Sequence, residues 1–175
     1  GLVLVLPAAA GCWSGVDNGG MLDVSEWRTR EDCLARSVDV LGRLAARYAA
    51  VPSLHAIQVL NEPRWDIPTD LLKAYYRRAY DAIRAHCGPE QVAVVFHDGF
   101  RPQGEYTGFF QPPEFRNVLY DVHRYQCFER GDLDLDIHGH LHKAGQQWKD
   151  EALEIQRDLG VPAISGEWSL GLDLK

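Results

Sequence analysis

The chain alternates short apolar runs with longer segments in which apolar residues recur every three or four positions. The short runs are five to seven residues long and rich in aliphatic and β-branched side chains, and the continuously apolar run 2–6 is typical of a parallel strand covered on both faces. The pattern predicts strands at residues 2–6, 54–60, 91–96, 117–123 and 161–165. It predicts helices at about residues 30–49, 69–87 and 137–159.

Each predicted helix has an apolar stripe that should face the core. In the first helix the stripe is Leu34, Val38, Leu41, Ala45 and Tyr48. In the second it is Leu72, Tyr75, Ala79 and Ile83. In the third it is Ile137, Leu141, Ala144, Trp148, Ile155 and Leu159. Thr29 with Asp32 three residues later resembles a capping box and predicts the start of the first helix.

Strands that alternate with helices predict parallel βα units and an α/β fold. A long glycine-rich loop, GCWSGVDNGG, follows the first strand where a dinucleotide-binding fold would begin a helix, so a Rossmann sheet is disfavoured. We predict a single domain, residues 1–175, of the (β/α)8 TIM-barrel type. Complete barrels usually need about 200 residues or more, so the barrel is expected to be truncated to about five βα units.

Composition narrows the choice of partners. The chain has 18 basic and 25 acidic residues, a formal net charge of −7, and its basic residues are scattered, so nucleic acid is not an expected partner. The longest apolar run, residues 1–11, is too short to span a bilayer, and no basic segment precedes it as in a signal peptide. The composition is that of an ordinary globular chain with no membrane partner.

Cysteines and histidines give no sign of a metal or cofactor. Cys12, Cys33, Cys87 and Cys127 are widely spaced without a C-x-x-C pair, which favours buried, unpaired thiols over a disulfide. His138, His140 and His142 have no carboxylate or cysteine at matching helical spacing, so we expect a solvated helix face and no metal site. No phosphate-binding loop is present, and we expect no cofactor.

Polar and ionisable residues follow the predicted strands, one group after another. They are Asp17 and Asn18, Asn61 and Glu62, His97 and Asp98, His123 and Tyr125, and Glu167. In a barrel, the carboxyl ends of the strands share one face, and active sites lie on that face. We expect these residues, together with Trp13 in the glycine-rich loop, to line one site.

The two glutamates carry the most information about chemistry. Glu62 and Glu167 each follow an apolar strand, where a carboxylate is costly to desolvate unless it is paired or used. Two carboxylates facing one another across a cleft are the equipment for glycoside hydrolysis. One protonates the leaving oxygen, while the other attacks the anomeric carbon or activates water, and their pKa values must differ.

These motifs resemble a known family. Leu60-Asn61-Glu62-Pro63 is similar to the acid/base motif of glycoside hydrolase family 5, and Gly166-Glu167-Trp168-Ser169 is similar to its nucleophile strand. The runs GVDNG at 15–19, HDGF at 97–100 and DVHRYQCF at 121–128 resemble the exo-β-1,3-glucanase branch in order and spacing. The resemblance covers essentially the whole chain and corresponds to the third through seventh strands of the family barrel.

The resemblance implies a retaining double displacement. Glu167 would be the nucleophile, Glu62 the acid/base and Asn61 a ligand of the sugar 2-hydroxyl, with carboxyl groups about 5 Å apart. Tyr125 would donate a hydrogen bond to Glu167, and His123 would contact sugar hydroxyls.

Further residues match sugar-binding positions of the family. Phe128 matches an aromatic at the mouth of the cleft, Asn18 matches a sugar-binding asparagine, and Trp13 or Trp168 could offer a flat face to a pyranose. Three positions depart from the family pattern: Pro7 stands in place of a cleft histidine, Val5 in place of an aspartate and Val16 in place of an entrance aromatic.

The expected substrate is β-1,3-glucan, a related β-glucoside or an oligosaccharide. Two alternatives stay open: a family 5 endo-β-1,4-glucanase, because the NEP and GEW motifs are shared across the family, and a carbohydrate-binding remnant without turnover. A truncated parallel sheet exposes two edges, so we expect either homo-oligomers formed through those edges or helices folded across them. Family members are typically secreted, and nothing in the sequence itself assigns a compartment.

Overall fold

The structure is a computed structural model that describes residues 1–16 and 19–172. Within these residues, five parallel strands form one sheet in which the spatial order of the strands is their order in the sequence. The strands are β1 (Leu2–Val5), β2 (Leu54–Gln58), β3 (Ala93–His97), β4 (Val118–Gln126) and β5 (Ala163–Leu172). This order of crossover connections is that of a (β/α) barrel, and the sheet is a curled half-barrel. The predicted truncated α/β barrel is confirmed.

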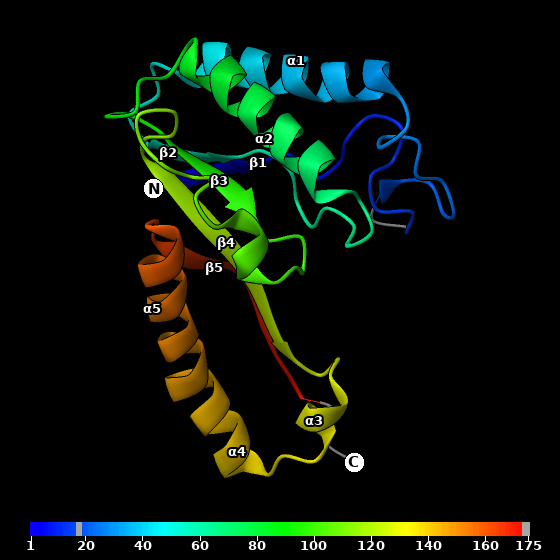
Figure 1. Cartoon of the computed structure of the whole chain (residues 1–175), viewed down its shortest axis with the longest axis vertical. Helices are drawn as coiled ribbons and strands as arrows, with labels where there is room; N and C mark the ends of the chain where they lie inside the picture. The colour runs from blue at the N-terminus through cyan, green and yellow to red at the C-terminus, as the bar shows by residue number, and fades with distance from the viewer. Residues whose placement is uncertain (17–18, 173–175) are drawn as a thin grey trace.

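Helices occupy the connections between the strands. They are α1 (Glu31–Tyr48), α2 (Thr69–Arg84), the 3-10 turn η2 (Gln103–Tyr106), α3 (Arg130–Leu133), α4 (Ile137–His142), the π-helical turn η3 (Lys143–Gln147) and α5 (Trp148–Leu159). In Figure 1, α1 and α2 lie side by side above the sheet, and α5 contacts β5. β4 and β5 continue past the shorter strands toward α3, which gives the sheet a long arm.

The core lies between the sheet and the first two helices. All four apolar positions predicted for α2 are buried, and on α1 Leu34, Leu41 and Ala45 are buried while Val38 and Tyr48 are partly buried. Tyrosine hydroxyls on the core side fix the ends of the strands. Tyr75 donates to the Val59 carbonyl at 2.8 Å and Tyr76 to the His97 carbonyl at 2.6 Å. Helix α2 therefore anchors the loops that carry the polar residues.

The outer strands β1 and β5 are partly uncovered, and β1 differs from the prediction that residues 2–6 form a strand covered on both faces. β3 is buried at all five positions, as expected for a central parallel strand. In β1, by contrast, Leu2, Val3 and Val5 are 40–47% exposed, and most of β5 is exposed. Among the described residues, β1 and β5 are the two edge strands of the sheet, because each pairs with only one other strand. Their side chains are therefore less covered than those of the central strand β3.

Two strands are longer than predicted. β4 extends to Gln126 and β5 to Leu172, so His123, Tyr125, Glu167 and Trp168 lie inside strands rather than beyond their ends. The two strands pair along this extension, and the ladder contains two irregularities in register. Hydrogen bonding between the strands, which apolar patterning does not encode, prolongs both of them.

The last predicted helix is broken into three parts, α4, η3 and α5. Only Ile155 and Leu159 of its predicted stripe are buried, whereas Ile137 and Leu141 are exposed. His140 is buried and donates from Nδ1 to Gln126 Oε1 at 2.8 Å, so the expected solvated histidine face is wrong at that position. The expected capping box is also wrong, because the N-cap of α1 is Arg30, with no side-chain cap bond.

Two further predictions concern the cysteines and the absence of a membrane-spanning helix. All four cysteines are unpaired thiols, and Cys12, Cys33 and Cys87 are buried, as predicted. Among the described residues, no helix combines the length and the apolar character needed to cross a bilayer.

Candidate active site

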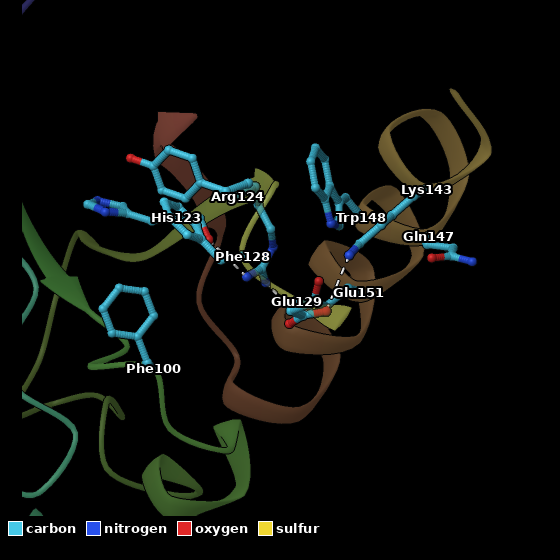
Figure 2. Close-up of a pocket in the computed structure, with 10 residues that line it drawn as sticks. Phe100, His123, Arg124, Phe128, Glu129, Lys143, Gln147, Trp148 and Glu151 are labelled. Atoms are coloured by element: carbon cyan, nitrogen blue, oxygen red, sulfur yellow. Dashed lines mark hydrogen bonds and ion pairs between the residues drawn. The ribbon is translucent and has the colours of Figure 1, made fainter. Parts of the chain in front are cut away.

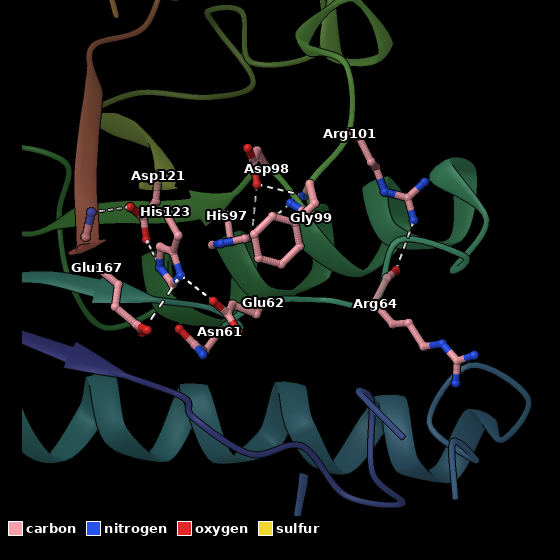
Figure 3. Close-up of polar contacts among 12 residues, drawn as sticks. Asn61, Glu62, Arg64, His97, Asp98, Gly99, Arg101, Asp121, His123 and Glu167 are labelled. Atoms are coloured by element: carbon pink, nitrogen blue, oxygen red, sulfur yellow. Dashed lines mark hydrogen bonds and ion pairs between the residues drawn. The ribbon is translucent and has the colours of Figure 1, made fainter. Parts of the chain in front are cut away.

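The carboxyl ends of four adjacent strands bring ionisable groups together (Figure 3). Glu62 lies in the loop after β2, and His97 is the last residue of β3. His123 on β4 pairs in register with Glu167 on β5. The strand ends meet at one face of the sheet, so residues far apart in the sequence contact one another, as the prediction of a single site required.

The backbone at Glu62 is held in an unusual conformation. Its φ of +41° lies in the left-handed region, which is strained for a residue with a side chain and costs about 1–3 kcal/mol. The buried indole of Trp13 holds this turn by donating to the Asn61 carbonyl at 2.6 Å and the Glu62 carbonyl at 3.1 Å. Trp13 is 0% exposed, so its predicted role as a sugar platform is wrong. It fixes the loop that carries Glu62.

The two glutamates meet at one imidazole nitrogen. His123 Nδ1 lies 2.6 Å from Glu62 Oε1 and 3.8 Å from Glu167 Oε2. These two carboxylate oxygens are therefore separated by no more than the sum of the two distances, about 6.4 Å. That limit is compatible with the separation of about 5–5.5 Å between the carboxyl groups of retaining glycosidases.

Tyr125 and Glu167 are hydrogen-bonded, with the phenol donating to the carboxylate Oε1. Burial and the neighbouring Glu167 raise the pKa of Tyr125, which keeps its hydroxyl protonated as a donor. The contact places Tyr125 where the family resemblance put it.

A buried polar layer lies behind these groups. Asp121 on β4 is 0% exposed; its Oδ1 accepts from the Gly166 backbone N–H at 2.6 Å and its Oδ2 accepts from Gln58 Nε2 at 2.7 Å. Oδ2 also lies 3.3 Å from His123 Nε2. No role had been assigned to Asp121 or Gln58 from the sequence. Their signal was a polar side chain within a predicted strand.

His123 lies between carboxylates on both sides of its ring. Burial alone would lower the pKa of His123, but Asp121 and Glu62 outweigh burial and raise that pKa to about 9. The ring is consequently an imidazolium at neutral pH. Its side chain is 1% exposed and both ring nitrogens face carboxylates. The expected contact of His123 with sugar hydroxyls stays a prediction.

His97 and Asp98 form the wall next to His123. The Gly99 N–H donates to His97 Nδ1 at 2.8 Å, and the Phe100 N–H donates to Asp98 Oδ1 at 2.8 Å. Burial, followed by the charge of His123, lowers the pKa of His97 to about 3, so this ring is neutral. Burial raises the pKa of Asp98 to about 6.

Among the described residues, Glu62, His97 and His123 have possible metal-ligand atoms within 4.8 Å of one another, which is close enough to surround a cation. The protonation of the two histidine rings does not suit a bound cation. The Gly99 N–H occupies the Nδ1 lone pair of His97 and leaves the ring proton on Nε2, while the raised pKa of His123 leaves both its nitrogens protonated. The cluster fits a proton network better than a metal centre.

Two cavities adjoin residues of the site. One of about 380 Å³ adjoins His123 and Tyr125, and another of about 450 Å³ adjoins Glu62. Phe100, a residue with a φ of +55°, lines both. Figure 2 shows the first cavity, with Lys143, Gln147 and Trp148 on the helical side opposite Phe100 and His123.

The remaining predicted sugar ligands are placed as follows. Phe128 is 80% exposed, lines the cavity beside Tyr125 and contacts the Tyr125 ring edge to face at 5.2 Å. Trp168 is exposed on β5 but does not line that cavity. Asn61 lies beside Glu62. Asn18, like Asp17, lies outside the described residues.

A parallel half-barrel with two carboxylates at the carboxyl ends of its strands is the arrangement of the (β/α)8 glycoside hydrolases. A family model described as Cellulase (glycosyl hydrolase family 5) matches residues 25–173. The chain belongs to glycosyl hydrolase family 5, as the sequence motifs had indicated.

Individual relatives agree with this assignment. The chain is 30% identical over 166 residues to the probable glucan 1,3-beta-glucosidase A of Aspergillus niger, a match that covers 94% of this chain and 38% of the relative. Among solved structures, the rutinosidase from Aspergillus niger aligns with a TM-score of 0.75 at 18% identity, over 97% of this chain and 49% of that one. Endoglucanase Cel5A from Thermotoga maritima aligns with a TM-score of 0.62 at 16% identity, over 82% and 51%. The chain thus spans about two fifths of the curated relative and about half of each solved chain.

Proposed function

We propose that residues 1–175 form part of a glycoside hydrolase catalytic domain that cleaves β-glucosidic bonds with retention of configuration. The observation that carries the proposal is the meeting of Glu62 and Glu167 at His123 Nδ1, within a limit of about 6.4 Å. Direct attack by one carboxylate needs a pair of carboxyl groups about 5–5.5 Å apart, and the observed limit is compatible with that separation.

In the first step, Glu167 attacks the anomeric carbon while Glu62 gives its proton to the leaving glycosidic oxygen. The bond between carbon and the leaving oxygen breaks, and an ester with Glu167 forms. In the second step, Glu62 accepts a proton from water, whose oxygen attacks the anomeric carbon and releases Glu167. Tyr125 orients the Glu167 carboxylate for attack by donating a hydrogen bond to it, and Asn61 binds the sugar 2-hydroxyl.

For the substrate we favour a β-1,3-glucan or a related β-glucoside. This choice rests on the similarity to a glucan 1,3-beta-glucosidase over nearly the whole chain. Cleavage of β-1,4-glucan is the alternative, supported by the fold likeness to an endoglucanase. The chemistry of the two carboxylates is the same in either case, and comparing hydrolysis of the two glucans distinguishes them.

The test is covalent trapping with 2-deoxy-2-fluoro-β-glucosyl fluoride, which leaves a stable ester on a retaining nucleophile. Mass spectrometry should find one added sugar on the peptide that contains Glu167, and Glu167→Ala should abolish the label. Glu151→Ala, which removes a carboxylate from the adjacent cavity wall, is the matched control and should still be labelled.

A folded protein that is not labelled, or is labelled elsewhere, contradicts the proposal. Binding of glucan without labelling, unchanged by Glu167→Ala, would instead support the carbohydrate-binding remnant.

We further propose that copies of the chain associate through the outer strands. Leu2, Val3 and Val5 expose apolar surface on β1, where the unpaired backbone of an edge strand is free to accept another strand. Sedimentation at several concentrations should show species larger than a 19.7 kDa monomer. A compact monomer that binds no apolar dye would contradict this proposal.

A further inference from the structure

Asp121 is the best connected side chain beneath the proposed catalytic pair. It is fully buried on β4 and contacts three strands: Gln58 on β2, His123 on its own strand and the Gly166 backbone on β5. Building on the proposed function, we propose that Asp121 is a positioning residue that holds His123 protonated and seats the backbone that carries Glu167.

The seating of β5 follows from Gly166. A Cβ at this position would lie 2.5 Å from both carboxylate oxygens of Asp121, so only glycine lets β5 approach so closely. The Gly166 N–H then donates to Oδ1 at 2.6 Å. Glu167 is the next residue, so the Asp121 contact fixes the backbone immediately before the proposed nucleophile.

The charge of His123 follows from the groups around its ring. Glu62 from the β2 loop faces Nδ1 at 2.6 Å, and Glu167 from β5 lies 3.8 Å away. Asp121 faces Nε2 at 3.3 Å, and the neutral His97 ring from β3 packs against His123 at 4.3 Å between centroids. Asp121 accepts hydrogen bonds from Gln58 Nε2 and the Gly166 N–H, which fix its carboxylate beside the His123 ring. A buried imidazolium needs such a partner at the nitrogen turned away from Glu62.

This arrangement supplies the proton that Glu62 needs as an acid. The Nδ1–H bond of His123 breaks as an O–H bond forms at Glu62 Oε1, and the electron pair stays on Nδ1. The two ions become two neutral groups, and the remaining Nε2–H continues to face Asp121. Asp121 therefore acts through His123 and touches no substrate.

The experiment is an NMR titration of the histidine ring nitrogens in the labelled full chain, with His123 assigned by His123→Gln. The wild-type ring should carry both protons at pH 7.5 and titrate with a midpoint near 9. Asp121→Asn keeps an oxygen for the Gly166 N–H but removes the charge, and it should lower the midpoint by at least one pH unit. Asp132→Asn, which removes another buried carboxylate, paired with Lys143, is the control and should leave the midpoint unchanged.

Two outcomes overturn the inference. One is a folded Asp121→Asn protein with the wild-type midpoint. The other, which applies even if that variant does not fold, is a wild-type His123 ring that is neutral at pH 7.5. Trapping by the fluorosugar on the same samples keeps the proposed function separate. If the wild type is labelled but Asp121→Asn leaves the His123 midpoint unchanged, the proposed function stands and the inference about Asp121 is refuted. If the wild type is not labelled but Asp121→Asn lowers the midpoint, the inference about Asp121 stands and the proposed function is refuted.

Discussion

The contact between Trp13 and the Glu62 loop leads to a sharp prediction. Trp13→Phe removes the indole N–H that donates to the carbonyls of Asn61 and Glu62 but keeps an aromatic ring in the core. We expect the protein to fold, to be less stable, and to react more slowly with the fluorosugar, because the strained φ of Glu62 loses its restraint.

The magnitude follows from two contributions. Leaving two carbonyls without their buried donor costs about 1–3 kcal/mol. The smaller ring at a site with 0% exposure adds a cavity contribution of about 1–2 kcal/mol. We therefore expect a loss of about 2–5 kcal/mol in the free energy of unfolding, out of roughly 5–15 kcal/mol for a typical domain. A displacement of Glu62 by about 1 Å would slow labelling by about a hundredfold.

The assay combines urea denaturation with the rate of covalent labelling at Glu167. Trp27→Phe is the matched control, because Trp27 is also 0% exposed and its indole donates to Ser37 Oγ at 3.2 Å, away from Glu62. It should lose about 1–3 kcal/mol and be labelled at the wild-type rate. If both variants are labelled at the same rate while folded, the reasoning that Trp13 positions Glu62 is refuted.

Three other substitutions test the site and its support. Tyr125→Phe removes the hydrogen bond that orients the Glu167 carboxylate for attack, so labelling should slow about tenfold to a hundredfold. Gly166→Ala forces a methyl group against Asp121 and should lower the free energy of unfolding by about 1–3 kcal/mol in urea denaturation. Asp98 has a pKa raised by burial to about 6, so its ionisation destabilises the fold as pH rises from about 4 through 6. Asp98→Asn should therefore stabilise the protein by about 1–3 kcal/mol at pH 7.5 and give no gain at pH 4.

Each of these has a result that contradicts it. Wild-type labelling of Tyr125→Phe would mean that the phenol does not support the nucleophile. Gly145→Ala, at a glycine where an added methyl group would meet no heavy atom within 4 Å, controls for the loss of glycine, and an equal effect at both positions would exclude the clash. An Asp98→Asn protein that is equally or less stable at pH 7.5 would show that Asp98 ionises without cost. Its retained oxygen keeps the acceptor for the Phe100 N–H.

Periodicity in the sequence predicted the elements of the fold because burial creates periodicity. The stripe of α2 is buried as predicted, and β3 is covered on both faces. The same argument failed for β1 and for the region around Ile137, where apolar residues are exposed. The composition of an apolar run does not reveal whether other elements pack over it, because those elements come from elsewhere in the sequence.

The site was predictable as far as side-chain type reveals chemistry. Glu62, Glu167 and the bond from Tyr125 were anticipated, whereas the roles of Trp13, His123 and Asp121 were not. An indole that binds a carbonyl and an indole that stacks on a sugar have the same local sequence. The distinction depends on a contact between residues 48 positions apart, which only the folded chain reveals.

The order of the strands has a consequence for protein engineering. Glu62, His97, His123 and Glu167 come from consecutive strands, β2 to β5, so every group that carries charge or protons in the proposed reaction is encoded within one continuous stretch of sequence. Dividing a barrel between β1 and the strand that would pair with its outer edge would leave that stretch of sequence uninterrupted. Fragment complementation across this edge, with barrel pieces taken from different relatives, would then exchange the walls that select a sugar while conserving the groups that react with it.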